Sequence, residues 1–194
     1  MEPRNRRATL VLLLGAAAVI GAGAATGTLF GYGLAFAWVV HFALMAWIAG
    51  WMQHAQPALS GGYWRARPWE PALHRRLGVW WYARLLRLLG WERVIRNQRA
   101  FDGSRSGLAA LTRDTRRSEF AHLVLALIGV GLAGVALLLG ARGAAGWLAV
   151  LTGLLHVYPV LLQRALRARV ERIATAAERI ATAAERIATA AERV

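Results

Sequence analysis

Residues 8–52 read ATLVLLLGAAAVIGAGAATGTLFGYGLAFAWVVHFALMAWIAGWM, which is 45 residues without a single Asp, Glu, Lys or Arg. A helix needs about 20 apolar residues to cross the hydrocarbon core of a bilayer. The run is therefore too long for one crossing, and three glycines between residues 27 and 33 indicate a turn. We expect two membrane-spanning helices, over about residues 8–27 and 30–52.

The second half of the chain holds two further runs without these four residue types, 120–141 and 143–163. Each run is long enough for one helical crossing. Small residues in the first of them would let a neighbouring backbone approach closely, namely Gly129, Gly131 and Gly134. The pattern predicts an all-α integral membrane protein with four transmembrane helices, and it excludes a soluble enzyme.

The basic residues indicate how the chain is oriented. All 24 are Arg, and they give a net charge of +14. The N-terminus, residues 53–119 and the segment after residue 163 share one side of a four-span protein, and they hold 23 of the 24. By the positive-inside rule this side is cytoplasmic. We therefore expect a bacterial inner-membrane protein with both termini in the cytoplasm, and no nucleic-acid partner.

The alternative for the first span is a cleaved signal peptide. Arg6-Arg7, the apolar run after it and Ala22-Gly23-Ala24 have the composition of such a segment. Cleavage would leave three spans, which would place an Arg-rich segment outside the cell, so we favour the four-span reading.

The segment between the second and third spans differs from a plain loop. From Leu73 to Ile95 the apolar residues recur with a helical period, and they include three Trp. The pattern predicts an amphipathic helix on the cytoplasmic membrane interface, either lying there passively or gating a substrate. Arg84 interrupts its apolar face and needs a carboxylate or a path to water. A second short polar helix or a loop is expected over Leu108–Arg117.

The chain ends in three copies of Ile-Ala-Thr-Ala-Ala-Glu-Arg, which start at Ile173, Ile180 and Ile187. Ala, Glu and Arg favour helix, so the fourth span should continue into a cytoplasmic helical tail. The seven-residue period places the Ile residues on one stripe, which would allow homo-oligomerisation as a coiled coil or through helix packing. We favour a repeat expansion without a dedicated role.

Four segments follow from this reading. They are an N-terminal transmembrane hairpin (1–52), an Arg-rich cytoplasmic segment with the interfacial helix (53–119), a second transmembrane hairpin (120–163) and the helical tail (164–194). Cys and Lys are absent, which excludes disulfides, thiolate catalysis, lipid anchors on cysteine and Schiff-base chemistry.

Ionisable residues within or beside a span are the strongest functional candidates. Glu119 and His122 are three positions apart at the start of the third span, so they share a helix face. A carboxylate beside an imidazole raises its basicity, as a general base requires. The structural alternative is a helix-start Glu followed by an interfacial His.

The fourth span contains His156, Tyr158, Pro159 and Gln163. Pro159 deprives the carbonyl of Leu155 of its helical donor, so we expect a kink near His156. His41 lies near the middle of the second span without a polar neighbour in sequence, and we assign it a structural role.

Glu70 and His74 supply a second carboxylate and imidazole pair. Together with Glu119 and His122 they would make a two-Glu, two-His metal site. Di-iron bundles need two Glu-x-x-His pairs and two further Glu, and the chain has one such pair. We therefore expect neither a metal nor another cofactor.

Five motifs occur in order over about residues 63–170. They are Trp69-Glu70, Trp80-Trp81-Tyr82, Trp91-Glu92-Arg93, Arg117-x-Glu119-x-x-His122 and Tyr158-Pro159-x-x-x-Gln163-Arg164-x-x-Arg167-x-Arg169. In type and order they resemble the glycosyl-4,4'-diaponeurosporenoate acyltransferases, small bacterial membrane proteins of carotenoid biosynthesis. The chain departs from that family at His156, where Asn is usual, and at Arg164-Ala165-Leu166-Arg167, where the family has a run like Arg-Tyr-Asn-Arg.

The resemblance implies transfer of a fatty acyl group from an acyl-CoA-type donor to a sugar hydroxyl of a glycosylated carotenoid or related membrane glycolipid. His122 would take the hydroxyl proton and Glu119 would hold His122. The predicted substrate-binding residues are Glu70, His74, Arg117, His156, Tyr158, Gln163, Arg164 and Arg167. Two alternatives are a non-catalytic lipid-binding scaffold and a glutathione-type four-helix transferase, to which Glu92-Arg93-x-x-Arg96 is similar.

Overall fold

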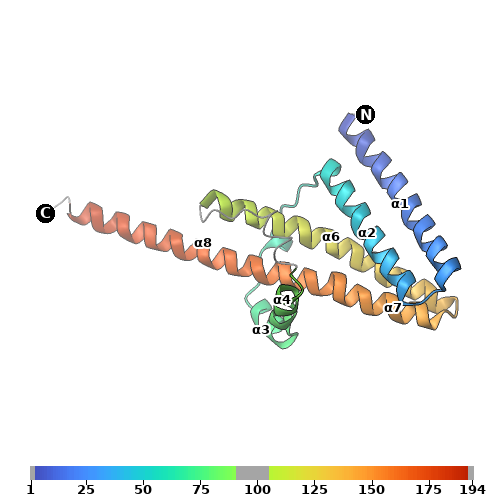
Figure 1. Ribbon diagram of the computed structural model, residues 1–194. Helices are drawn as coiled ribbons and strands as arrows, with labels where there is room; N and C mark the ends of the chain where they lie inside the picture. Colours follow the sequence, from blue (N-terminus) through green and yellow to red (C-terminus); the bar gives the residue numbers. More distant parts are fainter. Residues whose placement is uncertain (1–2, 91–104, 192–194) are drawn as a thin grey trace. The chain divides into compact units, whose positions relative to one another are not determined.

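The computed structural model describes residues 3–90 and 105–191, and every regular element in these ranges is helical (Figure 1). The elements are α1 (Pro3–Phe30), α2 (Leu34–Ala55), a 3₁₀ turn (Gly62–Trp64), α3 (Glu70–Arg76), α4 (Val79–Leu88), α6 (Arg105–Leu138), α7 (Arg142–Thr152), a π-helical turn (Gly153–Val157) and α8 (Tyr158–Ala191). Four stretches are helical, long and apolar enough to cross a membrane, namely Arg6–Phe30, Leu34–Ala55, Gly107–Leu138 and Arg142–Arg186. The predicted all-α fold with four spans is confirmed.

The chain divides into two compact units. The first unit combines Met1–Leu59 with Arg117–Val160, and the second combines Ser60–Arg116 with Leu161–Val194. Each unit is described separately below.

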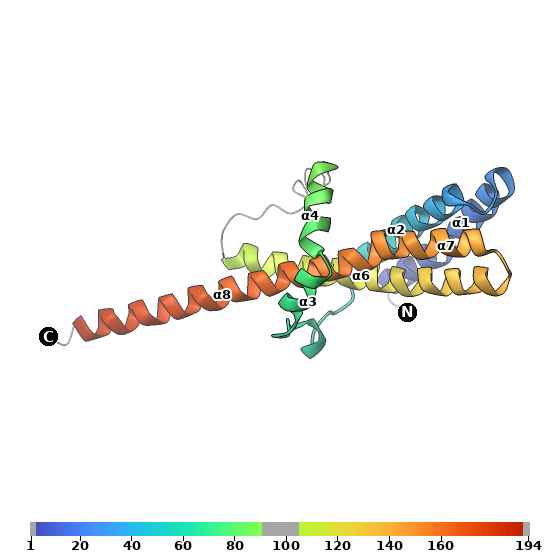
Figure 2. The ribbon, with the colours of Figure 1, turned by 90° about the horizontal axis from the view of Figure 1, so that it is seen from below.

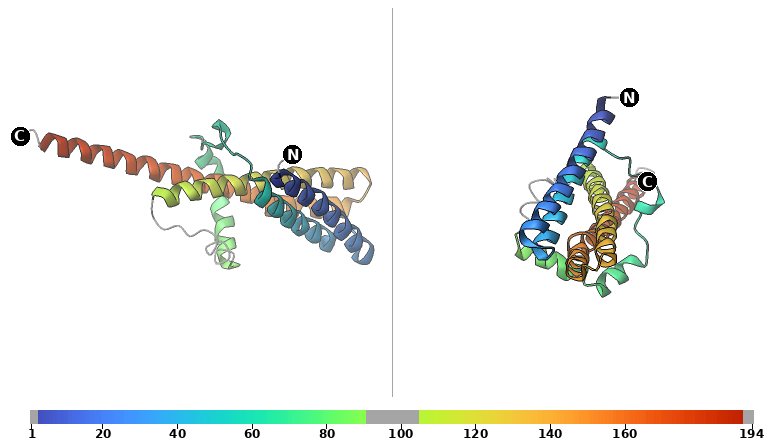
Figure 3. Two further views of the ribbon diagram at one scale, coloured as in Figure 1. Left: turned by 90° about the horizontal axis from the view of Figure 1, so that it is seen from above. Right: turned by 90° about the vertical axis from the view of Figure 1, so that its right-hand side faces the viewer.

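In the first unit, α1 and α2 form an antiparallel hairpin (Figures 1 and 3). Its turn lies a few residues later than the predicted helix bounds, because α1 continues to Phe30 and α2 starts at Leu34; Gly31 in the turn adopts a positive φ of 75°. Gly15 of α1 leaves room for the indole of Trp47 on α2. That indole nitrogen donates a hydrogen bond of 3.0 Å to the carbonyl of Leu12. The hairpin is therefore joined by both packing and a polar contact.

The core of the first unit joins α2, α6 and α7. Its buried apolar side chains are Ala37, Val40, Leu44, Ile48, Leu125, Leu148 and Leu151. Many other large apolar side chains of these helices are exposed, including Leu138 at 88%. Such an exposed apolar surface suits contact with lipid rather than water.

Among the three glycines that were predicted to allow close helix approach, Gly129 has this role. A Cβ at Gly129 would collide with the hydroxyl of Thr152 and would lie 3.2 Å from Cε1 of His41. Nothing lies within 4 Å of a Cβ at Gly131 or Gly134, so for those two positions the prediction was wrong.

The irregularity expected near Pro159 takes the form of a π-helical turn over Gly153–Val157. The N–H of Tyr158 donates to the carbonyl of Gly153, five residues earlier. A wider turn at this point follows from the missing N–H of proline. His156 lies in this turn, and its side chain is fully buried.

In the second unit, the single amphipathic helix predicted from Leu73 is interrupted. α3 ends at Arg76, Gly78 adopts a positive φ of 66°, and α4 starts at Val79 in a new direction (Figure 2). The apolar period continues on both sides of Gly78, so it does not reveal this break. Glycine adopts a positive φ at little cost, which allows the chain to change direction here. Residues 91–95 of the predicted helix lie outside the described residues.

α4 still exposes a mainly apolar surface, with Trp81 exposed at 74%. The guanidinium of Arg84 lies 5.7 Å from the ring centroid of Trp81. Among the described residues, the contact found for Arg84 is thus the face of an indole.

The segment 108–117 is not a separate helix or loop, because α6 runs without interruption from Arg105 to Leu138. Towards the C-terminus, α8 extends through the repeats to Ala191, as predicted. Ile173 and Ile180 of the predicted heptad stripe are exposed.

Candidate functional site

Three histidines from different parts of the sequence meet inside the first unit. His41 comes from α2, His122 from α6 and His156 from the π-helical turn. Nδ1 of His41 lies 2.9 Å from Nε2 of His156, and Nδ1 of His156 lies 3.4 Å from Nδ1 of His122. We call these three residues the histidine cluster.

A backbone carbonyl forms one end of the histidine cluster. Nε2 of His41 donates a hydrogen bond of 3.2 Å to the carbonyl of Leu148. The hydroxyl of Thr152 donates to the same oxygen at 2.7 Å. Two side-chain donors therefore meet at this carbonyl, and Gly129 provides the space that His41 and Thr152 occupy.

Glu119 lies one helical turn before His122 on α6, and its side chain is fully buried. Arg117, two positions earlier, is exposed. The pairing of Glu119 with His122, inferred from their spacing, stays a prediction. In the structure, the imidazole of His156 lies beside His122, and the imidazole of His41 lies beside His156.

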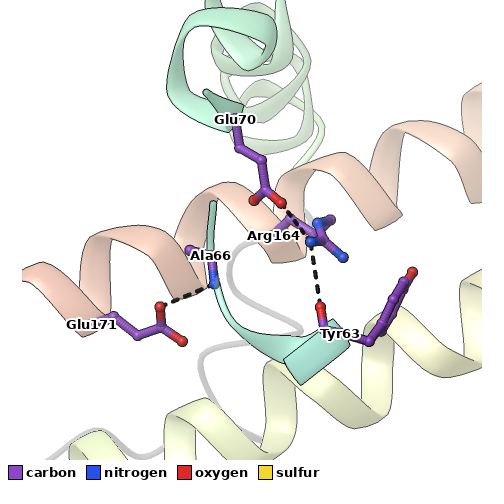
Figure 4. A network of polar contacts seen from close by, with 5 residues as sticks. All are labelled: Tyr63, Ala66, Glu70, Arg164 and Glu171. Carbon is purple, nitrogen blue, oxygen red and sulfur yellow. Dashed lines mark hydrogen bonds and ion pairs between the residues drawn. The ribbon is translucent and has the colours of Figure 1, made fainter. Parts of the chain in front are cut away.

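A second polar cluster lies in the second unit. The guanidinium of Arg164 on α8 forms an ion pair of 2.5 Å with Oε1 of Glu70 on α3 (Figure 4). The same Arg164 donates to the carbonyl of Tyr63 at 3.5 Å. Two helical turns beyond Arg164 on α8, the carboxylate of Glu171 accepts a hydrogen bond of 3.2 Å from the N–H of Ala66 (Figure 4). These contacts tie the loop before α3 to α8.

His74 follows Glu70 by one turn of α3, and both side chains are buried. Burial lowers the pKa of His74 below its usual 6.5, and the neighbouring charges of Glu70 and Arg164 act in opposite directions. His74 is therefore an uncharged imidazole at neutral pH. The structure brings Glu70, His74 and Arg164 together, which their distance in sequence does not reveal.

The other predicted binding residues of α8 differ in their accessibility. Gln163 is buried, Arg167 is fully buried, and Tyr158 is partly buried. The guanidinium of Arg167 lies 5.9 Å from the ring centroid of Trp64, which is itself buried. Arg164 and Arg167 thus take part in the packing of the second unit, and their contact with a substrate stays a prediction.

Of the four residues of the alternative metal site, Glu70 and His74 belong to the second unit and Glu119 and His122 to the first. Within residues 3–90 and 105–191, no group of three or more His, Asp or Glu side chains is arranged to hold a metal ion. The motif Glu92-Arg93-x-x-Arg96, on which the glutathione-type alternative depends, lies outside the described residues.

His41 is the member of the histidine cluster that was not among the predicted site residues. Its sequence neighbours are apolar, so a structural role was assigned to it. The available signal was its depth, because an ionisable side chain in the middle of a span is usually functional. Its partners are 107 and 115 positions away in sequence and become visible only in the fold.

A family model for glycosyl-4,4'-diaponeurosporenoate acyltransferase, CrtO, matches residues 60–176. The chain belongs to the CrtO family. The match covers more than half of the chain and includes every predicted site residue, but it starts after His41. No curated protein and no solved structure gives a significant match.

Membership of the CrtO family supports acyltransferase activity in carotenoid biosynthesis. The matched region runs from the loop before α3 to the first repeat of α8. The N-terminal hairpin, which contributes His41 to the histidine cluster, and most of the repeats lie outside the match.

Proposed function

We propose that this CrtO-family protein transfers a fatty acyl group from an acyl-CoA-type donor to a sugar hydroxyl of a glycosylated carotenoid. The observation that carries the proposal is the family match over residues 60–176. The four apolar helices agree with it, because an acceptor of this kind resides in the membrane.

The reaction requires a base for the sugar hydroxyl. In the proposed step the hydroxyl oxygen attacks the thioester carbonyl carbon, the new C–O bond forms and the C–S bond breaks. His122 accepts the hydroxyl proton and then delivers it to the departing thiolate, so that an ester and a free thiol result. Glu119, one turn away on α6, is the proposed counter-charge of the imidazolium that His122 becomes in this step.

The donor carries phosphates, which arginine side chains bind well. Arg117 is exposed and precedes His122 by five positions on α6, so it is the first candidate for this contact. Arg164 is engaged with Glu70, and Arg167 is fully buried. Arg164 can bind the acyl donor only if the phosphates compete with Glu70 for its guanidinium. Arg167 can bind the acyl donor only if its side chain becomes exposed.

The exposed indoles of the second unit agree with a position at the membrane surface. Trp69 precedes α3, and Trp80 and Trp81 lie on α4; all three are exposed. Tryptophan is typical of the headgroup region of membranes, so we place α4 at the cytoplasmic interface. In the same proposal residues 53–119 and 164–194 are cytoplasmic, and both termini lie in the cytoplasm of a bacterial inner membrane.

The test is expression of the chain in bacteria that make a glycosylated carotenoid without an acyl group. Mass spectrometry of the extracted pigments then shows whether a fatty acyl ester forms. We expect the ester with the native chain and with His54→Ala, a histidine outside both clusters. We expect at least an ~100-fold lower yield with His122→Ala, the usual effect of losing a general base.

Equal membrane levels of the variants must be verified, so that a lower yield does not reflect loss of protein. Full acyl transfer by purified His122→Ala would remove His122 from the mechanism. If the native chain forms no ester with acyl-CoA or acyl carrier protein as donor, the scaffold alternative is favoured. In that case Glu119→Ala and His122→Ala affect only the stability of the protein.

A further inference from the structure

From the geometry of the histidine cluster we infer that His41 and His156 are positioning residues, which hold the proton of His122 on Nδ1 and leave Nε2 as its basic nitrogen. The inference deepens the proposed function, since it names the atom of His122 that accepts the hydroxyl proton. It also assigns a role to His41, which lies outside the matched family region.

The carbonyl of Leu148 determines the position of the first proton in the cluster. A carbonyl oxygen accepts hydrogen bonds and never donates one. Nε2 of His41, at 3.2 Å from this oxygen, must therefore carry a hydrogen. In a neutral imidazole only one nitrogen is protonated, so Nδ1 of His41 has a lone pair and acts as an acceptor.

The second step assigns the proton of His156. Its Nε2 lies 2.9 Å from the lone pair on Nδ1 of His41. A hydrogen bond at this distance needs one hydrogen between the two nitrogens, which Nε2 of His156 must supply. Nδ1 of His156 is consequently unprotonated and accepts in turn.

The contact between His156 and His122 determines the proton of His122. Nδ1 of His122 lies 3.4 Å from Nδ1 of His156, a long contact within hydrogen-bonding range. Since Nδ1 of His156 is an acceptor, Nδ1 of His122 is the donor. In the proposed function His122 is a base, so its ring is neutral before it accepts a proton. With Nδ1 protonated, the lone pair that accepts the proton is then on Nε2.

These assignments assume neutral rings, and the surroundings of His41 and His156 support that assumption. Both side chains are fully buried in membrane-spanning segments. The partners of His41 are an imidazole and a backbone carbonyl, neither of which carries a negative charge. A cationic imidazole at such a position would cost several kcal/mol, on the order given for isolated buried charges.

The arrangement also explains how the cluster is held in place. The carbonyl of Leu148 receives a second donor from Thr152, which fixes it on α7. Gly129 leaves the space for Thr152 and His41 on the α6 side. A ring held at Nδ1 by a fixed acceptor presents Nε2 in a constant direction, which general-base catalysis requires.

The first experiment reads the protons without using activity. The full chain is labelled with ¹⁵N-histidine and placed in lipid nanodiscs, and His→Gln variants assign the ring signals. Protonated and unprotonated ring nitrogens differ widely in ¹⁵N chemical shift. We expect His122 as the Nδ1–H tautomer and both His41 and His156 as Nε2–H tautomers. Finding His122 as Nε2–H, or His156 as Nδ1–H, overturns the inference.

The second experiment compares two replacements of His156 in the acyl-transfer assay. The amide of Asn reaches the position of Nδ1, so His156→Asn keeps an acceptor for His122. The amide of Gln reaches the position of Nε2, so His156→Gln keeps the contact with His41 but loses that acceptor. We expect kcat to fall by about 10- to 100-fold in His156→Gln, with a smaller change in KM and a smaller loss in His156→Asn.

A purely structural role predicts a different result. Both replacements would then lower the thermal stability and kcat together, and the tautomer of His122 would not change. Equal kcat losses in the two variants, or an unchanged tautomer in His156→Gln, overturn the inference. If the native chain shows the expected tautomers but no acyl transfer, the proposed function fails while the proton assignment is supported.

Discussion

The guanidinium of Arg164 forms an ion pair of 2.5 Å with Glu70, a carboxylate 94 positions earlier in the chain. The side chains are exposed at only 13% and 3%, so water screens the pair weakly. Oε2 of Glu70 is buried without a hydrogen-bond partner among the described residues, which makes the carboxylate dependent on Arg164. The pair joins α3 to α8 within the second unit.

Removing one member of this pair should destabilise the protein more than removing both. We expect Arg164→Gln to cost about 3 kcal/mol, because it leaves a buried carboxylate without its counter-charge. The double variant Glu70→Gln with Arg164→Gln should be clearly more stable than Arg164→Gln alone. Thermal unfolding in detergent measures both, with the exposed Glu178→Gln as control. A double variant less stable than Arg164→Gln would contradict the idea that Arg164 neutralises the buried charge of Glu70.

The burial of His74 predicts a loss of stability in mild acid. Its pKa is lowered in the folded state, so below the usual pKa of 6.5 the unfolded chain binds a proton that the folded chain does not. The free energy of unfolding should therefore decrease as the pH falls from about 7 towards the lowered pKa of the folded state. His74→Gln should reduce this slope. Equal slopes in native protein and His74→Gln would refute the prediction.

Gly129 should tolerate no side chain. Its Cβ would overlap Thr152 and crowd His41, so we expect Gly129→Ala to cost about 1–3 kcal/mol of stability, as overpacking of a core does. Gly131→Ala, two positions along the same helix, meets open space and serves as the control. Thermal unfolding gives the comparison, and the ¹⁵N signals of His41 should move in the Gly129 variant alone. Similar stabilities of the two variants would contradict the packing at Gly129.

The natural absence of cysteine allows a direct test of the topology. Single cysteines at Tyr32 and Ala141 report on the two short turns, and cysteines at Ser60 and Thr182 report on the Arg-rich segments. A membrane-impermeant maleimide added to intact bacterial spheroplasts should label the first two and spare the second two. Labelling at Ser60 or Thr182 before lysis would place the Arg-rich side outside the cell and contradict the proposed orientation.

Much of the fold could be predicted from the sequence because membrane insertion depends on local composition. Uncharged runs of sufficient length specify spans wherever they occur, since an unpaired charge in hydrocarbon is expensive. Pro159 predicted an irregularity near His156, because a missing N–H disturbs the hydrogen bonds of the helix that contains it. The break at Gly78 escaped prediction, since apolar periodicity does not report a change in direction at one residue.

The candidate site was predicted only in part. The residues around His122 were found because a Glu three positions before a His is a local pattern. The contacts of His41 with His156 and of Arg164 with Glu70 join positions that are 115 and 94 residues apart. Local patterns contain no information about such pairs.

By itself, the amino-acid sequence determined that the chain is helical and contains four stretches that are long and apolar enough to cross a membrane. These properties follow from the transfer free energy of each segment and need no knowledge of its neighbours. The tertiary structure alone decided which buried polar groups meet, and the inferred position of the proton on His122 rests on those contacts. The direction of a hydrogen bond depends on the partner that packing supplies, and here the chain of partners begins at the carbonyl of Leu148.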